Sequence, residues 1–372
     1  MDYDKARRHQ SIKIIFSEII MFLTVVVTVV ILAFIVSGYW INEKFEVERQ
    51  GMLQIASSPT GADVFIDDES SWLQKTNTSK VLPVGEHTIR LSKDGYDSWT
   101  KTINITEGLL YRLHYPRLFP LHRDKTTVYD ALGVTEVFLS NDRDELLLYS
   151  GDPAHVNIDE YASTDATSSN DSNDSKVQSW TLINLKSREI EGKAVTKQTL
   201  RDFFKPQEQK ARDVVEDFKL PYKLKQSEEP ILSRFYDDDY LTIIDSDLIT
   251  LYKKGEASPI LQQRLSFVPS AHVEGGGGDF IVFYAGPRIA TLDMELLSIK
   301  EWSADGENIG WLDDNMIYTV SDGELIVYDY DGLNRRSIAK NISDRFPVTI
   351  AGDEWLYYFS DNNLIRENLR AS

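Results

Sequence analysis

The fold of the C-terminal part of the chain is decided by the stretch Asn315-Met316-Ile317-Tyr318-Thr319-Val320-Ser321-Asp322-Gly323-Glu324-Leu325-Ile326. An apolar run, a short polar turn and a second apolar run are typical of two antiparallel strands. The same pattern occurs at residues 239–249, 279–289 and 354–365, so the copies follow one another at spacings of 36 to 40 residues. Such periods, with several short strands in each unit, are typical of the blades of a β-propeller.

A fifth copy of the pattern is interrupted by an insertion. Residues 145–151 supply its first strand, and the second strand returns at residues 179–185. The tract between them has no large apolar residue from Ser163 to Ser175, which predicts a disordered insertion near residues 161–176. Residues 201–229 are charged and partly helix-like, and they form either a degenerate blade or an insertion. We therefore expect a propeller-like domain over residues 126–372, with about five to six blades.

The last copy ends soon after its second strand, which would leave an exposed sheet edge. Propellers commonly avoid such an edge by taking a strand from the other end of the domain. The strand-like residues Thr126–Asp130 are the candidate donor. The repeats resemble bacterial propeller-like surface domains, without the Gly-His and Trp-Asp signature of the WD40 family proper.

A smaller β unit is expected before the repeats, over residues 51–120. Residues 52–56 and 63–66 alternate as strands do on either side of a turn, which predicts a β-hairpin. Further short strands are expected at residues 87–91 and 100–105. Turn glycines such as Gly61 and Gly95 supply positive φ angles without steric cost.

Four sequence features give this unit its resemblance to a known family. They are Gly51-x-Leu53, Ser58-Pro59-Thr60-Gly61-Ala62-Asp63-Val64-Phe65-Ile66-Asp67, Val84-Gly85-Glu86-His87 and Lys93-Asp94-Gly95-Tyr96. Their order resembles a PEGA domain, a small β-sandwich common on bacterial and archaeal surface proteins. Thr60 stands where Glu is usual, Asp68 where Gly is usual, and Asn77 where Pro is common. The resemblance implies an extracytoplasmic module for adhesion, spacing or binding, and it implies no catalytic residues.

The apolar run Ile19–Trp40 predicts a single transmembrane helix. About 22 residues make a helix of about 33 Å, which matches the hydrocarbon thickness of a bilayer. Basic residues precede the run, so we expect residues 1–18 to form a cytoplasmic tail, residues 41–50 to be a linker, and the rest to be extracytoplasmic. A cleaved signal peptide is the alternative, and its apolar core would be shorter. A buried core helix fits less well, because the run has no polar face.

Composition excludes several classes of function. The chain of 372 residues has 59 acidic and 40 basic residues, and its net charge of −19 repels phosphate backbones, so we expect no nucleic-acid partner. It has no cysteine, which removes disulfides and thiolate chemistry.

No catalytic, cofactor-binding or metal-binding residue is nominated, and the ligand-binding residues stay unknown. The sequence lacks a Gly-x-Ser-x-Gly elbow, a phosphate loop and a His-Glu-x-x-His motif. Residues 303–306 match a sialidase Asp-box only in part and are expected to form a hairpin turn, while the acidic clusters at 171–174, 237–239 and 313–315 are expected to be solvated turns. Gly275–Gly278 is expected to be a flexible inter-blade loop, and the histidines are expected to be packed or solvated: His9, His87, His114, His122, His155 and His272.

The expected protein is thus mainly β, with one N-terminal transmembrane helix, a PEGA-like sandwich and a propeller-like domain. We expect a non-catalytic, membrane-anchored binding or scaffolding protein of the bacterial cell surface, whose partner is a cell-surface protein or glycan and which needs no cofactor. The alternative is a propeller hydrolase such as a glycosidase, which would need two facing carboxylates. A signalling receptor is a third option, and it would need a partner because the tail is short.

Overall fold

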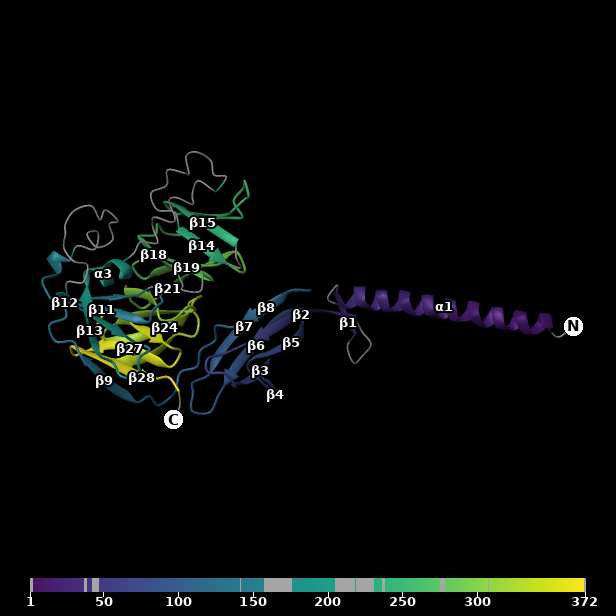
Figure 1. The fold of residues 1–372 in the computed structure, drawn as a ribbon, viewed down its shortest axis with the longest axis horizontal. Coiled ribbons are helices and arrows are strands. Elements are labelled where there is room, and N and C mark those ends of the chain that lie inside the picture. Colours follow the sequence, from purple (N-terminus) through teal and green to yellow (C-terminus); the bar gives the residue numbers. More distant parts are fainter. Residues whose placement is uncertain are drawn as a thin grey trace. The chain divides into compact units, whose positions relative to one another are not determined.

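A computed structural model describes residues 3–36, 39–41, 47–140, 142–156, 176–204, 218, 231–235, 238–274, 278–306 and 308–370. The chain divides into two compact units (Figure 1). The first contains residues 1–94 and 98–118, and the second contains residues 95–97 and 119–372. Both units are built mainly from strands, which confirms the predicted fold class.

Helix α1 (Tyr3–Val36) begins the first unit. Its segment Phe16–Ala33 is long and apolar enough to cross a membrane, and every side chain in that segment is exposed. The prediction that the helix continues to Trp40 is wrong, because β1 (Tyr39–Ile41) pairs with β2 (Val47–Ile55). Aromatic and β-branched side chains favour strands, and the pairing gives their backbone groups partners. The predicted linker at 41–50 is therefore partly strand; residues 42–46 lie outside the described residues.

The rest of the first unit is a β-sandwich. In one sheet β2 pairs with β1, β5 and β8, and the other sheet has the order β4-β3-β6-β7. Leu53, Ile89 and Trp99 are fully buried in its core. The further strands are β3 (Asp63–Ile66), β4 (Glu69–Lys75), β5 (Thr78–Pro83), β6 (Gly85–Ser92), β7 (Trp99–Ile105) and β8 (Leu110–Leu113).

The predicted hairpin between residues 52–56 and 63–66 is wrong. β2 and β3 belong to different sheets, with β5 and β8 beside β2 and with β4 and β6 beside β3. Alternation identifies a strand and its buried face, but it does not identify the partner strand. The turn glycines behave as predicted: Gly61 and Gly95 both have φ of 80°. Asp68, at the usual glycine position, also takes a positive φ of 62°.

The second unit contains five antiparallel four-stranded sheets within the described residues, here numbered in chain order. Helix α3 (Lys197–Phe203) and the short helix η1 (Pro153–His155) accompany sheet 1. Sheet 1 contains β10 (Glu136–Leu139), β11 (Glu145–Tyr149), β12 (Lys176–Asn184) and β13 (Gly192–Thr196); sheet 2 contains β14 (Ile231–Phe235), β15 (Asp238–Asp245), β16 (Leu248–Lys253) and β17 (Leu261–Arg264). Sheet 3 contains β18 (Ala271–Glu274), β19 (Phe280–Ala285), β20 (Arg288–Asp293) and β21 (Ser298–Ser303); sheet 4 contains β22 (Asn308–Trp311), β23 (Met316–Ser321), β24 (Glu324–Asp329) and β25 (Arg336–Lys340); sheet 5 contains β26 (Thr349–Ala351), β27 (Trp355–Ser360), β28 (Asn363–Asn368) and β9 (Lys125–Asp130).

The predicted repeats are the two middle strands of each sheet. The four regular copies are the pairs β15–β16, β19–β20, β23–β24 and β27–β28. In the fifth copy Tyr149 pairs with Trp180, so the two strands meet across the predicted insertion, most of which lies outside the described residues. The predicted donor strand is also confirmed, because β9 pairs with β28 and completes sheet 5.

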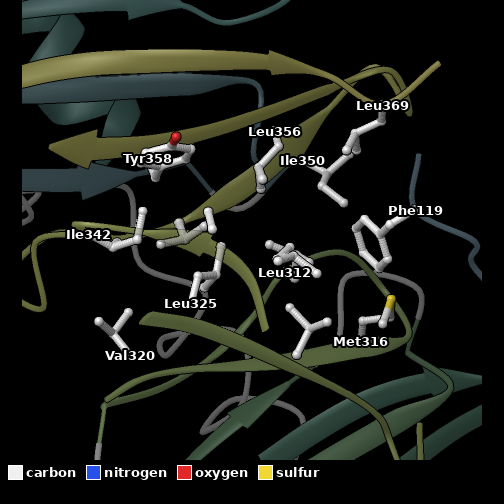
Figure 2. Packing of buried hydrophobic residues seen from close by; sticks show 14 residues of the cluster. Phe119, Leu312, Met316, Val320, Leu325, Ile342, Ile350, Leu356, Tyr358 and Leu369 are labelled. Atoms are coloured by element: carbon white, nitrogen blue, oxygen red, sulfur yellow. The ribbon is translucent and has the colours of Figure 1, made fainter. Parts of the chain in front are cut away.

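Apolar clusters and one pair of stacked rings link the sheets in the order 2–3–4–5–1. Figure 2 shows the cluster between sheets 4 and 5, which includes Leu325 and Tyr358. Other clusters join sheet 5 to sheet 1 and sheet 2 to sheet 3. Phe280 of sheet 3 stacks on Tyr330, which follows β24 of sheet 4, with the ring centroids 4.0 Å apart. α3 covers the other face of sheet 1, and Phe218 packs on sheet 2; the remainder of residues 205–230 lies outside the described part.

Candidate functional site

A buried arginine joins two sheets that are not consecutive in the packing order. Arg143 lies in the turn between β10 and β11, and Asp314 lies in the turn between β22 and β23. The Arg143 Nη1 atom lies 2.7 Å from the Asp314 Oδ1 atom, and the arginine side chain is only 13% exposed. Sheets 1 and 4 both pack on sheet 5, and this ion pair joins their two turns directly.

Tyr318 on β23 connects sheet 4 to the chain that enters sheet 5. Its hydroxyl accepts a hydrogen bond of 3.1 Å from the Val348 N–H, just before β26. Burial raises the pKa of Tyr318, so the phenol stays neutral. The ring lies over Gly310 on β22, where a Cβ atom would come within 2.7 Å of it. The glycine is therefore what allows a large ring at this position.

Charged and amide groups continue around the first strands of sheets 4, 5 and 1. The Asn308 side chain donates a hydrogen bond of 2.7 Å to the Asp344 carbonyl, and Arg345 lies 3.2 Å from Glu136. Trp311 on β22 donates to the Val273 carbonyl on β18, so first strands of sheets 3 and 4 are also neighbours. These contacts occupy the polar groups in joining neighbouring sheets.

The half-buried side chain of Trp302 lies on a surface between sheets 3 and 4. The Trp302 ring packs directly on Gly332, which has φ of 80° and where a Cβ atom would lie 2.6 Å from the ring. Tyr328 lies beside it, at 5.1 Å between ring centroids. Asp305 accepts hydrogen bonds from Arg335 and from the Tyr328 hydroxyl, and these donors, Arg335 first, lower the pKa of Asp305. An aromatic ring beside a fixed charge pair can contact a peptide or a sugar.

Glu367 forms a buried clasp where β9 joins β28. The carboxylate is fully buried and lies 2.8 Å from Arg123 Nε and 3.0 Å from Lys125 Nζ. The Tyr358 hydroxyl donates a third bond of 2.5 Å, and burial together with this carboxylate raises the pKa of Tyr358. The clasp holds the chain entering β9 against the last sheet, so its role is structural.

The acidic clusters weighed from the sequence lie in turns and strand ends. Asp313 accepts hydrogen bonds from the Asn315 and Met316 N–H groups, and Asp314 pairs with Arg143 as described above. Asp238 and Asp239 pair with Lys253 and Lys254 across sheet 2. Asp237, residues 171–174 and Gly275–Gly277 lie outside the described residues. The predicted inter-blade position of the glycines is wrong, because the strands before and after them, β18 and β19, pair within sheet 3.

Residues 303–306, the partial Asp-box, do not form the hairpin turn that the sequence predicted. Ser303 ends β21 of sheet 3, and the next strand, β22, belongs to sheet 4, so residues 304–306 connect two sheets. Short polar residues mark a reversal of the chain, but they do not show whether the next strand joins the same sheet.

The histidines are not brought together among the described residues, where no group of three or more metal-ligating side chains occurs. His87 is hydrogen-bonded to Asp67 and to the Pro83 carbonyl, and His114 contacts Tyr115 edge-on. The residues that sequence reasoning missed are Arg143, Trp302 and Glu367. Only Trp302 had a usable signal, because tryptophan is highly buried on average and therefore usually packs on another part of the chain.

A family model for the PEGA domain matches residues 50–117, close to the predicted range of 51–120. No curated protein matches the sequence. Among solved structures, Kuenenia stuttgartiensis hydrazine synthase aligns with 62% of this chain and 56% of its own, at 11% identity and a TM-score of 0.25. The uncharacterized protein lmo1340 from Listeria monocytogenes EGD-e aligns with 63% and 65%, at 15% identity and a TM-score of 0.24. The chain spans less than two thirds of either structure, and TM-scores this low carry no argument about function.

Proposed function

We propose that this chain is a membrane-anchored, extracytoplasmic binding or scaffolding protein of the bacterial cell surface. The observation that carries the proposal is the order of two elements: the exposed apolar segment Phe16–Ala33 and, directly after it, the PEGA domain at residues 50–117. PEGA domains are surface-associated, extracytoplasmic modules. An apolar helix with no protein covering it needs lipid around it.

In this proposal the sandwich is a spacer and the five-sheet unit is a propeller-like platform for a protein or glycan. The surface around Trp302 supports the second part, because it combines an aromatic ring with the fixed pair of Asp305 and Arg335. Arg143, Tyr318 and Glu367 support a rigid platform, since each ties together sheets or strands that are distant in sequence. The protein carries out no catalysis of its own in this proposal.

Cysteine labelling tests the topology cleanly, because the natural chain has no cysteine. Asn104→Cys places a thiol on an exposed position of β7, and Asp4→Cys places one in the N-terminal tail. A membrane-impermeant maleimide applied to intact cells, or to cells stripped of an outer barrier, should label the first variant. It should label the second only after lysis.

An alkaline carbonate wash of the same membranes separates an anchor from a cleaved signal sequence. If the N-terminal segment is an anchor, the mature protein keeps its tail and stays in the membrane after an alkaline carbonate wash. Loss of residues before the sandwich, or release by carbonate, would show that α1 is a signal sequence. Labelling of the tail in intact cells would reverse the proposed orientation.

A further inference from the structure

An exposed apolar row crosses the first sheet of the sandwich. Met52 on β2 is paired with Val81 on β5 and with Leu110 on β8, so the three side chains are direct neighbours across three strands. They are 44%, 48% and 42% exposed, although the alternate residues Leu53 and Leu82 on the same strands are buried in the core. Register and burial together place the row on the outward face of the sheet.

Two further exposed apolar residues flank these strands. Val84 and Leu109 are 46% and 61% exposed, and their backbone groups bond to Arg49 and Met52. The outward row itself consists of three large apolar side chains, and the two flanking residues lie just beyond the ends of β5 and β8. Contiguous exposed apolar groups, unlike single ones, mark a place where another surface binds.

The charge of this face favours a second copy of the chain as its partner. The chain has a net charge of −19, so two copies repel each other over most of their surfaces. The eight outward positions at which β2 pairs with β5 and β8 hold no carboxylate; they are Gln50, Met52, Gln54, Ser79, Val81, Pro83, Leu110 and Arg112. The next position of β2 in this register, Glu48, pairs with β1. Two such faces can approach each other without the repulsion that operates elsewhere.

The strand edge beside the row argues for face-to-face contact. β5 lies at the edge of its sheet and carries Lys80 and Pro83. Lysine and proline on an edge strand oppose pairing with a strand from another chain. The bilayer is a less suitable partner for the row. Val81, Met52 and Leu110 lie within a pleated face and have polar neighbours such as Gln54 and Ser79 on that face.

We propose that the row Val81–Met52–Leu110 is a homodimer interface formed between two copies in the same membrane. This inference rests on the proposed membrane anchor for its geometry. Arg49 is paired with Tyr39 just after α1, and Met52 lies three residues further, about 10 Å along the strand. Two anchored copies thus present their rows at the same height, and a two-fold axis along the membrane normal brings like residues together. Confinement to one membrane raises the effective concentration of the two faces, so a small contact can suffice.

Site-directed cross-linking of the full-length chain in membranes tests the interface. Met52→Cys puts a single thiol in the row, and Asn104→Cys puts one on the exposed face of the other sheet as a matched control. With a short bis-maleimide, the Met52→Cys protein should give at least about fivefold more of the species with twice the mass of the chain. Equal yields from the two variants would mean random collision and would overturn the proposal. A main product with a different protein would overturn it as well.

Charge substitutions test whether the row itself makes the contact. Adding Val81→Asp or Leu110→Asp to Met52→Cys should lower the dimer yield to that of the Asn104→Cys control, because like charges would then face each other across the two-fold axis. Adding Asn104→Asp should leave the yield unchanged. Two independent substitutions at exposed positions guard against loss of folding, and a yield that neither one lowers would contradict the interface.

The outcomes for the anchor and for the interface can be told apart. If carbonate washing leaves the protein in the membrane and no excess dimer forms, the anchor stands and the interface is wrong. If the protein is released, the anchor is wrong, and cross-linking of the released chain then tests the row without the membrane. Excess dimer in the released chain would keep the interface, and its absence would overturn it.

Discussion

The two β units of this protein differ in how the order of strands in each sheet follows the order of strands along the chain. In the sandwich, β2 pairs with β5 and β8, and β8 runs parallel to it from the far end of the domain. In the five-sheet unit, sheets 1 to 4 are made of strands that follow one another along the chain. Only sheet 5 breaks this rule, because its last strand is β9. The comparison teaches that the repeat unit depends on local pairing with one long-range closure, whereas the sandwich depends equally on local pairs (β1–β2, β3–β4, β6–β7) and on pairs of non-consecutive strands (β2–β5, β2–β8, β3–β6).

The largest effect should come from breaking the one long-range closure. Deleting Lys125–Asp130 removes β9, exposes the edge of β28 and takes away one partner of Glu367. Glu367→Ala alone should destabilise the unit by about 3–5 kcal/mol, because Arg123 and Tyr358 then lose the buried carboxylate that they contact. Thermal melts of the full-length protein in detergent would measure both changes, with Glu136→Gln at an exposed ion pair as the control.

The coupling between these two changes sharpens the comparison. Since the clasp and β9 belong to one closure, the double variant should lose less stability than the sum of the single losses. Additive losses, or an unchanged melting temperature after β9 is removed, would show that the five sheets are stable as an open array.

The difference between the units also explains what the sequence could predict. The repeats were found because each pair of strands and its turn are adjacent in sequence, as in the stretch Asn315–Ile326. The donor strand Thr126–Asp130 was predicted from the need to complete the last sheet. In the sandwich, alternation found β2 and β3 but paired them wrongly, since the partner of a strand is set by packing between the sheets.

Sequence was least informative about the functional surfaces. Arg143 and Asp314 lie 171 positions apart, and neither stands in a motif, so only the packing of sheets 1 and 4 around sheet 5 brings them together. Trp302 and Gly332 meet because sheets 3 and 4 are neighbours. The row of Met52, Val81 and Leu110 required the strand register, which composition and periodicity do not contain.

An intermediate effect is expected from adding one methyl group at a glycine in each unit. At Gly51 a Cβ atom would lie 2.5 Å from the Thr106 carbonyl oxygen and 3.1 Å from that of Leu109, both of which are backbone atoms. At Gly310 it would meet only the side chain of Tyr318, at 2.7 Å. Gly51→Ala should cost about 1–3 kcal/mol, and Gly310→Ala should cost less because a ring can move more easily than a backbone.

Hydrogen exchange measured by mass spectrometry can follow each unit separately in these variants. Gly51→Ala should speed exchange across all strands of the sandwich, because its long-range pairs open together. Gly310→Ala should affect mainly β22 and β23, and Gln54→Ala on the exposed face should change neither unit. Wider disturbance from Gly310→Ala than from Gly51→Ala would contradict the contrast between local and long-range assembly.

The smallest effect should appear in the response of each unit to acid, and its sign should differ between them. Hydrogen bonds from the Thr88 N–H and then from His87 lower the pKa of Asp67 in the sandwich below 3.8. This carboxylate therefore adds stability above the unfolded pKa and loses it as the pH falls through the folded pKa. Burial raises the pKa of Asp293 in sheet 3 above 3.8, so the ionised form weakens the fold as the pH rises through that folded pKa.

Near neutral pH, Asp67→Asn should lower the melting temperature of the sandwich, and Asp293→Asn should raise that of the five-sheet unit by a small amount. Asparagine keeps an oxygen that can accept the Glu295 and Leu296 N–H groups at Asp293, so the comparison isolates the charge. Both differences from the natural chain should shrink as the pH is lowered through the two pKa values, because the carboxyl groups then become neutral. Melts at a series of pH values would measure this convergence, and differences of the same sign, or differences that do not depend on pH, would show that these carboxyl groups contribute through shape rather than charge.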